Sequence, residues 1–175
     1  VAAFGFILFS LFAQVAPANE AAPLAADPVA EKRLMQLSEE LALLTEQVWR
    51  SRDDARAMAD SIKNGSLKKS LTSYADKMEK IRKELIATKE GQSITGEERL
   101  REKTSELYGS VAGYLGRPNT AQMEKFAYLR SQLNDQQKAA KQVWDSDLAK
   151  LNTQLKAAGF KSIDLIDKAA FDKMD

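Results

Sequence analysis

The stretch SLKKSLTSYADKMEKIRKEL, residues 66–85, repeats large apolar residues at alternating steps of four and three. These residues are Leu67, Leu71, Tyr74, Met78, Ile81 and Leu85. Steps of three and four place side chains on one side of an α-helix, so the pattern predicts a helix that buries one face against other helices. It is the most regular heptad pattern in the chain, and it indicates an all-α protein.

The segments on either side of this stretch have the same period. Asp27-Pro28 supplies an N-cap followed by proline at the first helical position, so we expect a first helix over residues 28–63. Asn64-Gly65 is expected to end it, because both residues tolerate the left-handed conformation of a helix C-terminus. The second helix is expected to continue until Gly91.

Helix start signals recur in the second half of the chain. Thr95 with Glu98, and Asn119 with Gln122, have the spacing of a capping box, in which each side chain bonds the other residue's backbone. A third and a fourth helix are therefore expected to begin at these positions. The fourth is long, and Gly159 is expected to close it.

These four segments predict an all-α, up-and-down antiparallel bundle of three to four long helices, because their connections are short and no strand pattern of comparable strength appears. The first and fourth helices are the longest, so part of this pair is expected to pack as an antiparallel hairpin. The predicted division of the chain is a signal peptide over 1–18, a linker over 19–27, the bundle over 28–160 and a short amphipathic tail over 161–175.

The N-terminal segment VAAFGFILFSLFAQVAPA, residues 1–18, is apolar and uncharged. It ends in Ala16-Pro17-Ala18, which resembles the small-residue cleavage site of a secretory signal peptide. The apolar run is shorter than the roughly 20 residues of a membrane span. We therefore expect export to the periplasm or the outside of the cell, with cleavage of this segment. A retained membrane anchor and a trimmed core segment are the alternatives, since no basic residue precedes the run and the chain begins with Val1.

Composition excludes several functional classes. The chain has 26 basic and 25 acidic residues, and this balance argues against a nucleic-acid binder. It has no Cys and no His, which removes thiolate nucleophiles, Cys/His zinc sites and imidazole bases. No phosphate-binding loop, HExxH motif or nucleophile elbow occurs, and no pair of carboxylates is marked out as a glycosidase pair. We expect no enzymatic activity and no cofactor.

The segment LYGSVAGYLGRPNTAQ, residues 107–122, has an unusual share of glycine and tyrosine. One interpretation is a tightly packed helical corner, in which small residues let a partner backbone approach and Gly116 and Pro118 end the third helix. The corner residues are Gly109, Gly113, Gly116, Pro118 and Asn119. The other interpretation is an exposed recognition surface made of Tyr108, Tyr114 and Arg117, because tyrosine and arginine are common interface anchors.

Two further features have a structural and a functional interpretation. The second helix is rich in lysine, which suits either an anionic lipid surface or, as we expect, a solvated face paired with acidic residues of the first helix. Trp49 and Trp144 lie at or beside the apolar stripes of the two long helices. We expect both to pack in the core or at a bundle end and not to form a ligand cage.

The corner segment and DLAKLNTQLKAAG, residues 147–159, resemble the helical C-terminal region of large exported BNR-repeat proteins, which are sialidase- or sortilin-like β-propellers often labelled glycosyl hydrolases. The matching residues are Leu107, Tyr108, Gly109, Val111, Tyr114, Gly116, Arg117, Pro118 and Gln122, then Asp147, Leu148, Asn152 and Leu155. Propeller repeats with Asp-box turns are missing from this chain. The resemblance implies export and association with a propeller protein, and it implies no catalytic residue here.

Three functional hypotheses follow. The first is a non-enzymatic, exported helical accessory or interaction module, with a β-propeller domain as the candidate partner. The second is the C-terminal fragment of a BNR-type glycosyl hydrolase whose catalytic propeller is missing. The third is a membrane-surface or chaperone-like clamp, with membrane contact through the N-terminal segment or the basic second helix.

Overall fold

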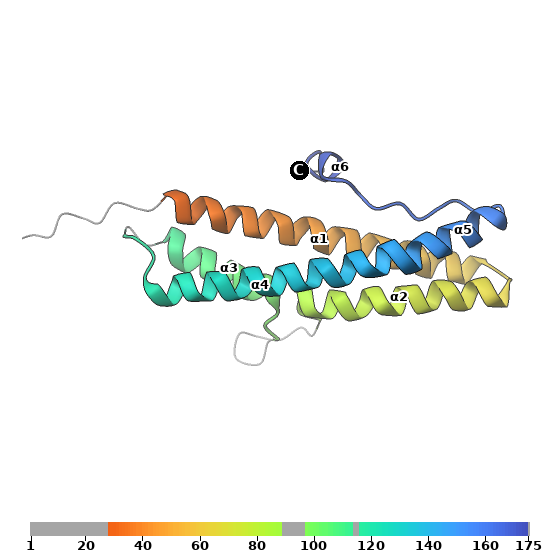
Figure 1. The fold of residues 1–175 in the computed structure, drawn as a ribbon, viewed down its shortest axis with the longest axis horizontal. Helices are drawn as coiled ribbons and strands as arrows, with labels where there is room; N and C mark the ends of the chain where they lie inside the picture. Colours follow the sequence, from red (N-terminus) through yellow and green to blue (C-terminus); the bar gives the residue numbers. More distant parts are fainter. Residues whose placement is uncertain (1–27, 89–96, 114–115, 175) are drawn as a thin grey trace, which may run out of the picture.

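The computed structural model describes residues 28–88, 97–113 and 116–174, and within these ranges all regular structure is helical. The helices form three limbs (Figure 1). The elements are α1 Pro28–Ser61, α2 Gly65–Leu85, α3 Leu100–Ala112, α4 Thr120–Val143, the π-helix η1 Trp144–Leu148, α5 Ala149–Ala157 and α6 Lys168–Phe171. The prediction of an all-α helical bundle is confirmed.

The limbs run up, down and up. Helix α1 is the first limb, α2 and α3 follow each other along the second, and α4, η1 and α5 form the third (Figure 1). Because the second limb returns the chain to the starting end, α1 and α4 run in the same direction. The expected antiparallel hairpin of the two long helices is therefore wrong. The break between α2 and α3 causes this, since two short helices in tandem match the length of one long helix.

The core lies where the three limbs meet, and the predicted heptad of the second helix faces it. All six apolar residues of that heptad are buried, and Ala75 joins them. Leu37 of α1 and Leu133 of α4 are fully buried on the facing limbs. Fully burying a leucine side chain is worth about 1.5–3 kcal/mol, so this shared interior is the main source of stability.

The first three helix boundaries differ from the prediction. Asn64 does not end α1 in a left-handed conformation; its side-chain oxygen accepts hydrogen bonds from the backbone N–H groups of Ser66 and Leu67 (3.0 and 3.2 Å), so it is the N-cap of α2. Helix α2 ends at Leu85 and not at Gly91, because Ile86 takes an extended conformation that keeps its side chain buried.

Helix α3 begins later than predicted. Thr95 lies outside the described residues, and Glu98 precedes the helix. Glu102 is the acidic residue that caps it, because its carboxylate accepts hydrogen bonds from the backbone N–H groups of Arg99 (3.0 Å) and Ala87 (3.1 Å). The second bond also fastens the chain just after α2, so one carboxylate holds both sides of the connection.

Both predicted boundaries of the long last limb are confirmed. Asn119 and Gln122 exchange hydrogen bonds between side chain and backbone, each 2.9 Å long, at the start of α4. Gly159 has φ +79° after α5. The next N–H group, that of Phe160, bonds the carbonyl of Leu155 (2.9 Å), which is the six-to-one bond of a Schellman motif.

A π-turn interrupts this limb over Trp144–Leu148, and sequence reasoning missed it. The buried residues Leu133, Ala140, Leu148 and Leu155 are separated by seven, eight and seven positions. The step of eight contains one residue more than a heptad allows. A π-turn absorbs one extra residue, so the same face of the limb stays toward the core on both sides of it.

The tail after Gly159 packs back along α1 (Figure 1). Ile163 is buried, and its backbone N–H and carbonyl are both bonded by the Asn152 side-chain amide at 2.9 Å. The Gln47 side chain donates to the carbonyl of Ile166 (2.8 Å). The tail is mostly extended, and only its last part forms the four-residue helix α6.

A candidate docking groove between α1 and α3

A groove with a volume of about 390 Å³ lies between α1 and α3, and α6 closes part of it. This volume lies within the usual range for pockets that bind small molecules or side chains. The α1 wall consists of Ser38, Leu41, Ala42, Thr45, Glu46 and Trp49; the α3 wall consists of Arg101, Thr104, Ser105 and Tyr108; and Phe171 comes from α6. The surface is largely apolar and includes three aromatic side chains.

Trp49 is the most exposed aromatic residue of this groove. It keeps 48% of its surface accessible, so the expectation that it packs in the core or at a bundle end is wrong. Val48 holds the buried position, and the next residue on a helix points about 100° away from it. Trp144 does pack against the core, as expected. The signal for Trp49 was present in the sequence, because it lies one position off the apolar stripe.

Thr104 lines the groove with a buried hydroxyl group. The residue is only 2% exposed, and its oxygen has no hydrogen-bond partner among the described residues. Buried polar groups in folded proteins are nearly always hydrogen-bonded. The oxygen is itself enclosed, so this hydroxyl is an unsatisfied polar group within the groove wall and not an accessible contact point.

The predicted recognition residues do not form one surface in the described part of the chain. Tyr108 lines the groove and packs against the core. Arg117 is exposed in the connection to α4 and is not part of the groove wall. Tyr114 lies outside the described residues. The prediction located one groove residue and missed Trp49 and Phe171, which lie far from Tyr108 in the sequence.

The expected tight packing at the corner is wrong for Gly109. A Cβ atom added there would meet nothing within 4 Å among the described residues, so none of their backbone approaches this side of α3. The helix also ends earlier than expected, at Ala112, and Gly113 is its C-cap in place of Gly116. Gly116 itself is buried in the connection. The exposed small residues face solvent because Leu107 and Val111 already fill the packing face of α3.

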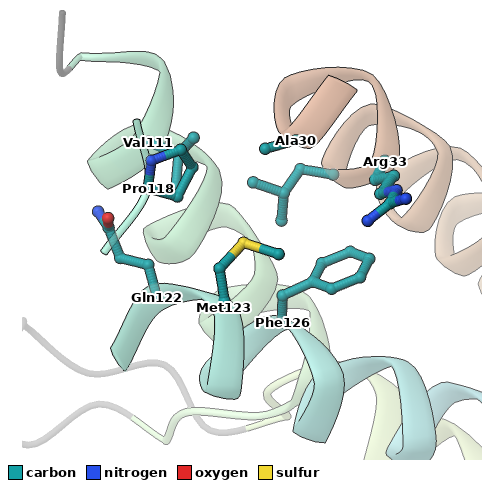
Figure 2. A pocket seen from close by; sticks show the side chains of 8 residues that line it. Ala30, Arg33, Val111, Pro118, Gln122, Met123 and Phe126 are labelled. Carbon is teal, nitrogen blue, oxygen red and sulfur yellow. The ribbon is translucent and has the colours of Figure 1, made fainter. Parts of the chain in front are cut away.

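Side chains from α1, α3 and α4 converge at the bundle end beside this corner, as Figure 2 shows. Pro118, Met123 and Phe126 converge there with Val111 of α3 and Ala30 of α1 around a space of about 10 Å³. This is about the volume needed for one water molecule, so the space is a packing gap and not a ligand site. The Gln122 side chain also donates to the Ser110 carbonyl (3.2 Å), which fastens α4 to α3.

In the ion pair between α1 and α2 the basic residue comes from α1 and the acidic residue from α2, which is the reverse of what we expected. Arg52 of α1 donates to the Glu79 carboxylate of α2 (2.5 Å), and Arg82 bonds both oxygens of the same carboxylate (2.8 and 2.9 Å). These partners lower the pKa of Glu79 to about 2. The lysines of α2 lie on the far side of the helix, where Lys77 pairs with Asp147 of η1 (2.6 Å).

A second set of buried polar groups adjoins the π-turn. The Tyr74 hydroxyl of α2 faces Ser51 of α1 and the Trp144 indole of η1. Burial is the main reason that the pKa of Tyr74 is raised to about 12. Neither the Tyr74 oxygen nor the Trp144 nitrogen has a well-formed hydrogen bond within the described residues. This set is enclosed by the three limbs, so it belongs to the core and not to a surface site.

No cluster of acidic side chains within the described residues is arranged to hold a metal ion. Within the same residues, no helix has the length and apolar character needed to cross a membrane. The fold and the groove define the class of this protein as an all-α, three-limbed bundle with an aromatic surface groove. Comparisons of the chain with protein-family models, with curated proteins and with solved structures gave no match.

Proposed function

We propose that this protein is a non-enzymatic, exported helical accessory module that binds another protein through the groove between α1 and α3. The observation that carries the proposal is the half-exposed Trp49 beside Tyr108, over a largely apolar floor. Large aromatic residues in a desolvated depression supply much of the binding energy of protein interfaces. Most other large apolar residues of the bundle are buried, so this combination stands out on the described surface.

A β-propeller domain is the partner that we propose for this surface. The support is the resemblance of residues 107–122 and 147–159 to the helical region that follows the propeller in exported BNR-repeat proteins. The second candidate function is a C-terminal fragment of such a hydrolase. The DNA upstream of the gene distinguishes the two, because Asp-box repeats in frame or one frame away favour the fragment, and an intact neighbouring propeller gene favours the accessory module.

The direct test is a binding measurement with the propeller protein encoded beside or upstream of this gene. We expect Trp49→Ala and Tyr108→Ala each to weaken binding at least tenfold, about 1.4 kcal/mol. Thr72→Ala on the exposed face of α2 is the matched control and should leave affinity unchanged. Equal affinities for all three variants would contradict binding through the groove. Absence of a propeller gene beside or upstream of this gene would contradict the choice of partner.

Export and the absence of catalysis have their own tests. Expression in a bacterial host should place the protein outside the cytoplasm, with a mature N-terminus after Ala18 in N-terminal sequencing. An intact N-terminus in the membrane fraction would instead indicate a retained anchor. Turnover of a glycoside by the purified chain, above a control that lacks α4, would refute the non-enzymatic assignment.

The exposed side of α2 supports one further candidate function, a membrane-surface clamp. Lys68, Lys69 and Lys80 share this side and are exposed. Clustered lysines contribute about 1 kcal/mol each toward an anionic lipid surface. Cosedimentation with anionic vesicles and not with neutral ones would favour this function, and equal binding to both would count against it.

A further inference from the structure

The groove already has an occupant at one of its ends. Phe171 lies on α6 and lines the groove together with Trp49 and Tyr108. It reaches this place because the tail reverses direction after Gly159 and packs back along α1 (Figure 1). The chain therefore presents to its own groove a short helical turn that carries one aromatic side chain.

The part of the tail that carries Phe171 is weakly held compared with the part before it. Ile163 is buried and Asn152 bonds both of its backbone groups, whereas Lys168, Ala169 and Ala170 are exposed. A four-residue helix has little stability of its own, because its first turn fixes several residues for one hydrogen bond. The Arg50 guanidinium also reaches the Met174 sulfur after α6 (3.4 Å). Helix α6 is therefore held mainly by this contact and by Phe171, whereas Ile163 is anchored separately in the core.

Charge on α1 matches the residues that flank Phe171. Lys168 lies one helical turn before Phe171, where it pairs with Asp172 (3.0 Å) and is attracted by Glu39 of α1. Glu46 of α1 lines the groove itself but pairs with Arg50, and Arg101 of α3 lies on the opposite wall. Glu39 of α1, near the place that Lys168 takes beside the aromatic depression, therefore favours a segment with a lysine three positions before its aromatic residue.

We propose that α6 is a displaceable occupant of the groove, and that the segment which replaces it is a short helical turn of a partner protein with a lysine three residues before an aromatic side chain. The inference rests on the proposed function, since it names the chemistry of the segment that the groove binds. In the free protein Phe171 occupies one end of the groove and leaves half of Trp49 exposed, and the partner segment competes with it. The apparent affinity for the partner segment then equals the affinity of the open groove multiplied by the fraction of molecules in which Phe171 has left it.

The test uses the full chain and a fluorescently labelled peptide of residues 161–174 as the probe. Phe171→Asp should remove the internal competitor, because a carboxylate is costly to bury in an apolar groove. We expect the peptide to bind this variant at least tenfold more tightly than it binds the wild-type chain, as measured by fluorescence anisotropy. Phe160→Asp is the matched control, because Phe160 is also an exposed phenylalanine of the tail but lies outside the groove, and it should behave like the wild type.

Two further measurements locate the binding. A peptide in which Phe171 is replaced by Asp should not bind, and Trp49→Ala added to the Phe171→Asp chain should abolish binding of the normal peptide. Equal peptide affinity for the wild-type, Phe171→Asp and Phe160→Asp chains overturns the inference, and so does the absence of binding to the Phe171→Asp chain. The proposed function is judged separately. If a propeller bound through Trp49 with equal affinity for the wild type and Phe171→Asp, the result would support the docking groove and contradict only the competition by Phe171.

Discussion

Glu79 shows how much a single side chain in this bundle depends on its partners. Its carboxylate takes hydrogen bonds from two arginines on two helices, and Arg52 is itself nearly buried beside it. Removing one member of such a set leaves a poorly solvated charge behind, and this loss is larger than the net gain from the pair. Trp49 lies at the opposite extreme, since nothing in the described chain covers half of its surface.

The lowered pKa of Glu79 makes stability depend on pH in a defined direction. The hydrogen bonds from Arg82 and Arg52 lower this pKa from 4.5 to about 2, so the folded state binds a proton less readily than the unfolded state. The resulting stabilisation is complete above pH 4.5 and is lost as the pH falls toward 2. We expect Glu79→Gln to lower the free energy of unfolding at pH 7 by a few kcal/mol at most.

Urea unfolding of wild type and Glu79→Gln at several pH values from 7 to 2 checks this. The difference between the two proteins should shrink as the pH falls from 4.5 toward 2. Asp60→Asn is the control, since Asp60 is an exposed carboxylate of α1. A difference between wild type and Glu79→Gln that stays constant over the whole range would contradict the assignment.

Gly109 and Gly159 should respond in opposite ways to alanine. Gly109 lies in α3 with open space where a Cβ would be, so Gly109→Ala should stabilise the protein by about 1 kcal/mol through helix propensity. Gly159 has φ +79°, so Gly159→Ala should destabilise it by about 1 kcal/mol. Thermal unfolding measures both changes. A loss of stability in Gly109→Ala would show that a partner backbone does approach this helix.

At the scale of elements, the last limb depends on its π-turn. Buried Leu133 and Ala140 lie before the turn, and buried Leu148 and Leu155 lie after it. One extra residue between the two pairs would rotate the second pair about 100° away from the core in an uninterrupted α-helix. The π-turn removes this rotation, so both pairs face the core although the apolar residues are eight positions apart at this point.

Deletion of a residue should therefore be tolerated at one place in this limb and not at another. Deleting Asp145, an exposed residue of the π-turn, should give a continuous α-helix with the core register intact and cost less than about 2 kcal/mol. Deleting the exposed Asp135 of α4 should turn later apolar residues out of the core and prevent cooperative folding. Circular dichroism during thermal unfolding distinguishes these outcomes. Equal damage from both deletions would refute the register argument.

At the scale of the whole molecule, burial is unequal between the two halves of the second limb. Helix α2 buries seven of its 21 residues and the shorter α3 buries four of its 13, so the totals differ although the proportions are similar; one of the four in α3 is Thr104 with its unpartnered hydroxyl. A segment with fewer buried apolar contacts opens at a lower free energy. The groove also lies against α3, which places the candidate docking surface on the less stable half of the limb.

Native-state hydrogen exchange should reveal this difference. We expect the central amides of α3 to exchange at least tenfold faster than those of α2, because partial opening of α3 leaves the pairing of α1 with α2 intact. Leu71→Ala, in the fully buried heptad of α2, should speed exchange in both helices by weakening the common core. Equal protection of α2 and α3 in the wild type would mean that the bundle opens as one unit.

Much of the helical content could be predicted because its signals are local. The apolar period of residues 67–85 predicted the buried face of α2, and the spacing of Asn119 and Gln122 predicted the start of α4. The candidate site could be predicted only for Tyr108. Its other aromatic members, Trp49 and Phe171, come from segments that no local pattern connects to Tyr108.

The sequence by itself determined that this chain folds as packed helices, because a three-and-four apolar period and its caps act within one or two helical turns. Only the tertiary structure decided that α2 and α3 share a limb, that α1 and α4 run in the same direction, and that the tail brings Phe171 beside Trp49. These arrangements depend on which apolar faces meet across long chain separations. Burial of apolar surface is non-directional, so the geometry of the whole bundle selects the partners.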